Sequence, residues 1–152
     1  MFTLIRPIAA LMLGVFALYA AQIYEPLFDP EADLGSMPIW AAAISAVVGW
    51  GFLGGRIGRA MWYSAFVGVQ AVVLAAICTA GFLAVGEVFT RGYRRQYTEV
   101  VEAITGYFGI VVDWLSRGLV QDYLILLGVG GLAIGALLHI VWGLMERRRN
   151  AR

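Results

Sequence analysis

The side chain best suited to chemistry in this sequence is a lone histidine. His139 is the one histidine among 152 residues, and it lies in a long uncharged run of the chain. A metal or haem site needs further ligands, and no second histidine is available to supply one. We therefore expect a neutral imidazole with a hydrogen-bond partner, unless a homo-oligomer brings a second histidine to it.

A short basic cluster, Arg91, Arg94 and Arg95, is the second candidate, and it follows another uncharged run. The guanidinium group presents paired N–H donors that fit oxyanions, so this cluster could bind an anion. Arginines at the end of an apolar run also contact lipid headgroups, and that is the interpretation we favour.

The other polar residues do not form a recognisable catalytic pattern. A Ser/His/Asp or paired-carboxylate site requires residues that converge on a cleft, so we predict a non-enzymatic protein without catalytic residues. Cys78 is the single cysteine, which excludes an intramolecular disulfide and a CxxC motif. The acids between Glu25 and Asp33 match no ordered calcium loop and are typical of a solvated loop. We expect no metal, no cofactor and no nucleic-acid partner.

These residues belong to an unusually apolar chain. Hydrophobic residues make up 61% of the sequence, against about 45–50% in soluble domains. Four uncharged runs carry the excess, and each is close to or above the roughly 20 residues that a membrane crossing needs. We therefore predict an all-α polytopic membrane protein, one domain over residues 1–152 with four transmembrane helices. The predicted spans are residues 7–24, 37–53, 60–86 and 123–145.

The first of these runs has a competing interpretation. Arg6 precedes its apolar stretch, as a positive charge does in a secretory signal peptide, and Ala20-Ala21-Gln22 resembles a cleavage site. The stretch is about 17 residues long, the upper end for a signal core and adequate for a span. We expect a span and leave cleavage as the alternative.

The segment between the third and fourth runs predicts a helix of another kind. Over residues 93–117, apolar side chains such as Ile104, Phe108 and Leu115 recur on one face. Glu102 and Asp113 lie on the opposite face, which is the period of an amphipathic helix. We expect this helix to lie along the outer membrane surface, in contact with lipids, and not to cross.

The distribution of arginines predicts the orientation, because cytoplasmic loops carry an excess of them. With four crossings and a cytoplasmic N-terminus, more arginines are inside than outside. The cluster of Arg91, Arg94 and Arg95 is an exception, because this topology places it outside. We expect a multi-pass protein of the bacterial inner membrane with both termini in the cytoplasm. The arginines predicted to lie inside are Arg6, Arg56, Arg59, Arg147, Arg148, Arg149 and Arg152.

Small residues at spacings of three and four predict how the spans associate, since helices in lipid pack closely at such residues. In the fourth run Gly128, Gly131 and Gly135 form such a stripe. His139 continues it, so the histidine should point into the bundle as an intramembrane polar site. Cys78 should also face inward. The other stripes are Ala10, Gly14, Ala17 and Ala21; Ala42, Ala46 and Gly49; and Ser64, Gly68, Ala71, Ala75 and Thr79.

Two sets of short motifs resemble one known family. They are Gly49-Trp50 with Gly55-Arg56-Ile57-Gly58-Arg59, and Arg91 with Tyr93-Arg94-Arg95-Gln96-Tyr97 and Glu102-Ala103. They are similar to motifs of the TrgA family, small inner-membrane proteins of alphaproteobacteria associated with tellurite resistance. The acidic, proline-containing first loop and the four apolar runs also fit, so the resemblance covers most of the chain. Leu53 and Gly54 depart from the pattern, because a basic residue is expected there.

This resemblance implies a role in tellurite resistance or in envelope redox balance, and it carries no catalytic residue to this chain. We expect a non-enzymatic inner-membrane protein that contributes to tellurite resistance, as a homo-oligomer or within a larger membrane complex. One alternative is a small oxyanion transporter or exporter that uses Arg91, Arg94 and Arg95. Another is an accessory subunit of a membrane redox complex, with His139 beside a haem or quinone.

Overall fold

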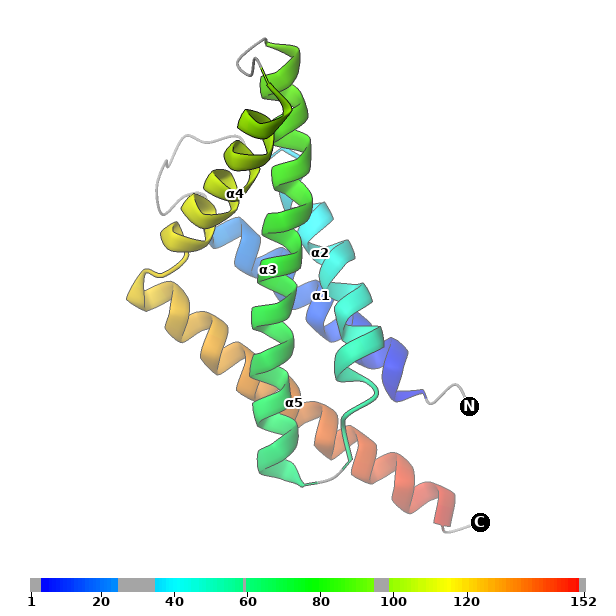
Figure 1. Ribbon diagram of the computed structural model, residues 1–152. Coiled ribbons are helices and arrows are strands. Elements are labelled where there is room, and N and C mark those ends of the chain that lie inside the picture. The colour runs from blue at the N-terminus through cyan, green and yellow to red at the C-terminus, as the bar shows by residue number, and fades with distance from the viewer. Residues whose placement is uncertain (1–3, 25–34, 59, 95–98, 151–152) are drawn as a thin grey trace.

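The computed structural model of the chain describes residues 4–24, 35–58, 60–94 and 99–150 (Figure 1). These residues are helical apart from short connections, which confirms the all-α prediction. The elements in chain order are α1 (Ile5–Tyr24), α2 (Met37–Val48), the π-helical turn η2 (Gly49–Leu53), α3 (Met61–Tyr93), α4 (Val100–Arg117) and α5 (Gln121–Asn150).

Three of the helices are long and apolar enough to cross a membrane. They are α1, α3 and the part of α5 up to Arg147, so the chain has the helices of a membrane protein. The second predicted span corresponds to α2 followed directly by η2, with 12 and 5 residues. At about 1.5 Å per residue, this pair is about 25 Å long, slightly less than the roughly 30 Å hydrocarbon core of a bilayer.

The predicted start of the surface helix is wrong. We expected the amphipathic helix to begin at Tyr93, but Tyr93 is the last residue of α3, which continues without a break past Gly86, the end of the predicted span. Inside this extension, Arg91 Nε donates to Glu87 Oε1 at 2.8 Å, one helical turn away, so the charged residues support the helix. The amphipathic helix α4 begins at Val100 and ends at Arg117, as predicted for its C-terminal limit.

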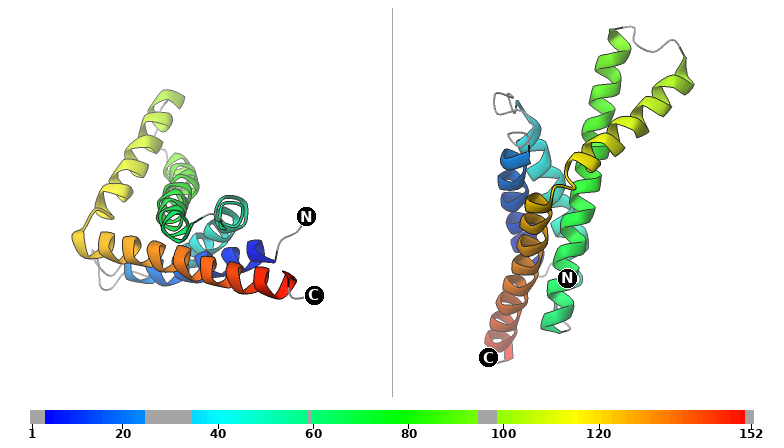
Figure 2. Two further views of the ribbon diagram at one scale, coloured as in Figure 1. Left: turned by 90° about the horizontal axis from the view of Figure 1, so that it is seen from below. Right: turned by 90° about the vertical axis from the view of Figure 1, so that its left-hand side faces the viewer.

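Four helices, α1, α2, α3 and α5, form a ring, and α4 lies outside it against α3. α1 packs against α2 and α5, while α3 packs against α2 and α5 on the other side of the ring. The C-terminal part of α3 extends past the neighbouring helices, and α4 runs diagonally back from it toward the start of α5 (Figures 1 and 2). The first turn of α1, the last turns of α5 and the turn after η2 lie at one end of the ring (Figure 1). We call this the terminal end and the opposite one the distal end.

The closest approach in the fold is the crossing of α3 and α5. A Cβ atom added to Gly131 would lie 2.8 Å from Val69 Cα, and one added to Gly135 would lie 2.8 Å from Ala65 Cα. A Cβ on Gly68 would meet the Gly131 carbonyl oxygen and lie 2.9 Å from Gly135 Cα. The two backbones therefore touch over a full helical turn. Such contact requires glycine, since any side chain would separate the helices.

The crossing of α1 and α2 is of the same kind. A Cβ on Gly49 would lie 2.6 Å from the Ala9 carbonyl oxygen, and one on Gly14 would lie 3.1 Å from the Ala42 carbonyl oxygen. The turn that follows η2 is equally tight. Gly58 there has a φ of 115°, which favours glycine, and a Cβ on it would lie 2.8 Å from the Trp142 ring.

Replacing Gly131 with alanine should destabilise the protein, because the new methyl group can be accommodated only if the α3 and α5 backbones move apart. Overpacking of this kind costs about 1–3 kcal/mol. Gly128 is the matched control, since nothing in the described part of the chain lies within 4 Å of its Cβ position. Thermal unfolding in detergent, followed by circular dichroism, should show a lower Tm for Gly131→Ala and an unchanged or higher Tm for Gly128→Ala. Equal Tm values for the two variants would contradict the crossing.

Candidate functional site

His139 lies beside the glycine crossing and is hydrogen-bonded across it. Its Nδ1 is 3.1 Å from the Oγ of Ser64, a fully buried residue of α3. Whether the hydroxyl donates or the ring nitrogen does depends on the imidazole tautomer. The Trp142 ring lies next to the imidazole, with ring centroids 5.8 Å apart. We expected His139 to face another helix and to have a hydrogen-bond partner. In the structure it faces α3, and the partner is Ser64.

The stripe that led to His139 is only partly used in the contact. Gly131 and Gly135 form the crossing with α3, while a Cβ added to Gly128, one turn earlier, would have no described atom of another helix within 4 Å. The two α-helices diverge from the crossing, so small residues one turn away lose contact. A second expectation fails: Cys78 of α3 is exposed and does not face the interior of the ring.

Arg91 and Arg94 lie at the far end of α3, well away from His139. Arg91 is bound to Glu87, and both side chains are about 40% exposed. Arg94 is exposed and caps the end of α3, while Arg95 lies outside the described residues. A carboxylate already bound to Arg91 repels an incoming oxyanion, so the electrostatics here suit lipid headgroups and water better than an anion site.

The described histidine, cysteine and carboxylate side chains do not form a metal-binding cluster. Within the ranges that the structure describes, no three His, Cys, Asp or Glu side chains come close enough to hold a metal ion. Two ion pairs, Glu87–Arg91 and Asp113–Arg117, each join residues one helical turn apart on the surface.

A cavity at the distal end of the ring was not foreseen from the sequence. It has a volume of about 1040 Å³ and lies between α1, α2, α3, the end of α4 and the start of α5. Leu13, which is fully buried, forms part of its floor toward the terminal end. Beyond that floor the centre of the ring is filled by larger side chains, among them Leu53, Val67 and Leu138.

Alanine is the most frequent residue in the wall of the cavity, although larger side chains such as Phe16 of α1 and Leu83 of α3 also line it. Methyl groups cannot fill a gap of this width, whereas leucine or phenylalanine would. The alanines in the wall are Ala17, Ala20 and Ala21 of α1, Ala41 of α2, and Ala75, Ala76 and Ala80 of α3.

Two tyrosines join the helices that bound the cavity at its distal side. Tyr24, at the end of α1, donates to the Trp114 carbonyl oxygen of α4 at 2.7 Å. The Tyr123 hydroxyl of α5 points to the Ala20 carbonyl oxygen at 3.4 Å, and the two phenol rings are 5.6 Å apart. These contacts fix the ends of α1, α4 and α5 relative to one another, so the cavity is part of the fold and not a loose gap.

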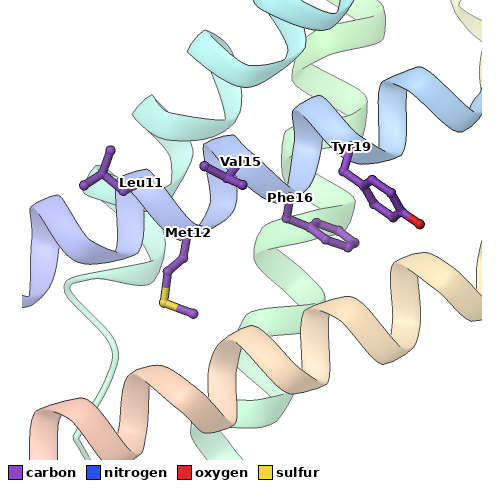
Figure 3. A pocket seen from close by; sticks show the side chains of 5 residues that line it. All are labelled: Leu11, Met12, Val15, Phe16 and Tyr19. Atoms are coloured by element: carbon purple, nitrogen blue, oxygen red, sulfur yellow. The ribbon is translucent and has the colours of Figure 1, made fainter.

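A smaller hollow of about 500 Å³ lies along α1 (Figure 3). Met12 and Phe16 point toward α5 there, while Leu11 and Val15 point away from it (Figure 3). The Phe16 ring occupies the space over Gly130, where any Cβ would collide with it. Leu11, Val15 and Tyr19 are more than half exposed, so this hollow is an open apolar surface.

Comparison of the chain with protein-family models, with curated proteins and with solved structures finds no match. The site must therefore be interpreted from its own geometry. Two features are available: a part-buried hydrogen-bonded pair beside a helix crossing, and a largely apolar cavity whose lining includes Glu87 and Arg117.

Proposed function

We propose that this chain is a non-enzymatic, multi-pass protein of the bacterial inner membrane that contributes to tellurite resistance. The observation that carries the membrane part is the outer surface of the long helices. Leu11 of α1, Phe66 of α3 and Val129 of α5 are each more than half exposed, on helices long enough to span a bilayer. Such surfaces are stable in lipid and costly in water.

Four crossings and cytoplasmic termini are the topology that we propose. α2 with η2 runs between α1 and α3, and a span slightly shorter than the bilayer core is accommodated by local thinning. Ile5, Ala9 and Leu13 of α1 are buried in the core, which favours a retained first span over a cleaved signal peptide. Arg6, Arg56 and Arg147 belong to the terminal end, as a cytoplasmic end requires.

We propose further that α4 lies at the outer interface. Its apolar residues Val100, Ile104, Phe108 and Val112 recur every four residues and are all more than half exposed. On the side facing α3, Tyr107 donates to the Gly81 carbonyl oxygen at 3.2 Å. A helix anchored to a span, with a free apolar stripe, is suited to immersion at headgroup depth. Membrane lipids are thus the first partners, and a second copy or a larger membrane complex would use the same lipid-facing surfaces.

The link to tellurite comes from the resemblance of the turn and arginine motifs to the TrgA family. The physical arguments bear on how the protein acts: Ser64 and His139 stabilise a helix crossing, and Glu87 neutralises Arg91. These contacts favour a role that depends on the intact bundle over transport of an oxyanion through the arginines.

The proposed topology predicts which cysteines a membrane-impermeant maleimide reaches. In a Cys78→Ser background, Gly92→Cys near the end of α3 should be labelled in intact spheroplasts. Gly55→Cys, in the turn after η2, should be labelled only after lysis, because the two sites lie on opposite sides of the membrane. Both positions are exposed in the fold. Labelling of Gly55→Cys in intact spheroplasts would exclude this orientation.

Deletion of the gene should make cells more sensitive to tellurite, and the wild-type protein should restore resistance. Gly131→Leu should fail to restore it, because the α3–α5 crossing cannot form, whereas the matched Gly128→Leu should succeed. Arg91→Gln with Arg94→Gln should also restore resistance, since we assign no anion site to these arginines. Growth over a tellurite series, with immunoblots for protein level, measures each case. A deletion strain with unchanged resistance would remove the tellurite role, and loss only in the arginine variant would favour oxyanion transport.

A further inference from the structure

The distal cavity is covered on one side by the C-terminal half of α4. α3 and α5 diverge from their glycine crossing, and α4 runs between their distal ends (Figure 1). Trp114 and Leu115 of α4, with Gly118 just after it, line the cavity of about 1040 Å³. Residues 112–118, which we call the lid segment, therefore close the cavity on this side.

α4 is attached to the ring by little buried surface. Ile110 is the one buried residue among its 18, whereas α1 buries six of its 20 residues. A segment with few buried apolar contacts separates from the rest of a fold at a lower free energy than the core does. Inside lipid the exclusion of water does not press α4 against the ring, so the specific contacts between them determine its position.

Two tyrosine hydroxyls join α4 to the ring at different points. Tyr107, in the middle of α4, donates to the Gly81 carbonyl oxygen of α3 at 3.2 Å. Tyr24, at the end of α1, donates to the Trp114 carbonyl oxygen at 2.7 Å, within the lid segment. The first contact holds the helix to α3 outside the lid segment, and the second holds the lid segment itself against α1.

The hydrogen bond from Tyr24 is not needed to complete the end of α4. The Trp114 carbonyl oxygen also accepts the Gly118 backbone N–H at 3.2 Å, so the last turn of the helix is closed by its own backbone. The Tyr24 hydroxyl adds a second bond to the same oxygen, and this bond connects α4 to α1. Its removal therefore releases the lid segment without leaving that carbonyl group unpaired or breaking the helix.

We propose that the lid segment opens and closes the distal cavity by pivoting about the contact between Tyr107 and Gly81, and that the Tyr24 hydroxyl is the latch of the closed state. Opening separates the lid segment from α1 and joins the cavity to the apolar outer surface. Val112 and Leu119, which are 64% and 66% exposed, belong to that surface. The device requires no particular occupant of the cavity, and it is independent of tellurite and of the orientation in the membrane.

Thiol labelling inside the cavity tests the latch. In a Cys78→Ser background, Ala80→Cys places a thiol on the cavity wall at a buried position of α3. Tyr24→Phe removes the hydroxyl and keeps the ring, which packs against Tyr123. N-ethylmaleimide, which enters apolar phases, should label Ala80→Cys about two- to tenfold faster when Tyr24→Phe is present, the range expected for the loss of one hydrogen bond.

Two controls separate opening of the lid from general loosening. Tyr19→Phe removes a hydroxyl from an exposed position of α1 and should leave the labelling of Ala80→Cys unchanged. The native Cys78, exposed on the same helix as Ala80, should react at one rate with and without Tyr24→Phe. Circular dichroism and a cooperative melt show that each variant is folded. An unchanged rate at Ala80→Cys, an equal increase with Tyr19→Phe, or a parallel increase at Cys78 would overturn the latch.

Distances between spin labels test the movement itself. In the Cys78→Ser background, labels at Ser116→Cys in the lid segment and Leu11→Cys on α1 are both at exposed positions. Pulsed electron resonance on protein in lipid nanodiscs should show a longer distance component for this pair when Tyr24→Phe is present. The matched pair Leu11→Cys with Val129→Cys joins two helices of the ring and should keep one distribution. If the Ser116 pair also keeps one distribution in Tyr24→Phe, α4 does not move and the lid is excluded, whatever the labelling rate.

Discussion

The contact of the α3 and α5 backbones at Gly68, Gly131 and Gly135 is the constraint on which the rest of the structure depends. Inside a bilayer the exclusion of water does not drive helices together, since the lipid is as apolar as their side chains. Association depends on close van der Waals contact and on hydrogen bonds between helices. The glycines supply the contact, and the hydrogen bond between Ser64 and His139 lies next to it. That pair also fixes the register, because the two side chains meet at one relative position of the helices.

The distal cavity follows from this crossing and from its counterpart between α1 and α2. Each crossing holds two helices at backbone distance, and the ring closes where α1 meets α5 and α2 meets α3. The centre of the ring remains wide, so its contents depend on side-chain size. Leu53, Val67 and Leu138 fill it toward the terminal end, and alanines leave it open toward the distal end. Alanine thus lies in close helix contacts at the α1–α2 crossing and also lines the cavity.

Much of the fold could be predicted from the apolar pattern, and the errors have identifiable causes. Long uncharged runs locate α1, α3 and α5, and the amphipathic period locates α4. The start of the amphipathic helix was placed too early because the uncharged run ends before Glu87, whereas a charged pair such as Glu87–Arg91 allows α3 to continue to Tyr93. The glycine stripe identified Gly131 and Gly135 but also Gly128, because spacing along one helix does not reveal where a partner diverges. His139 was expected to face another helix, and it is half-buried there, but its partner on α3 could not be identified before the two helices were placed. The cavity had no signal in the sequence, since an alanine in close contact and an alanine facing a gap are identical there.

Disulfide cross-linking in native membranes tests the α3–α5 register most directly. In a Cys78→Ser background, the pair Ser64→Cys with His139→Cys replaces two side chains whose polar atoms are 3.1 Å apart. The account predicts rapid cross-linking of this pair under mild oxidation. It predicts little for Ser64→Cys with Leu137→Cys, because Leu137 is close in sequence but half exposed on another face of α5. Cross-linking of the Leu137 pair at an equal or higher rate would show that α3 and α5 do not meet through the glycine face.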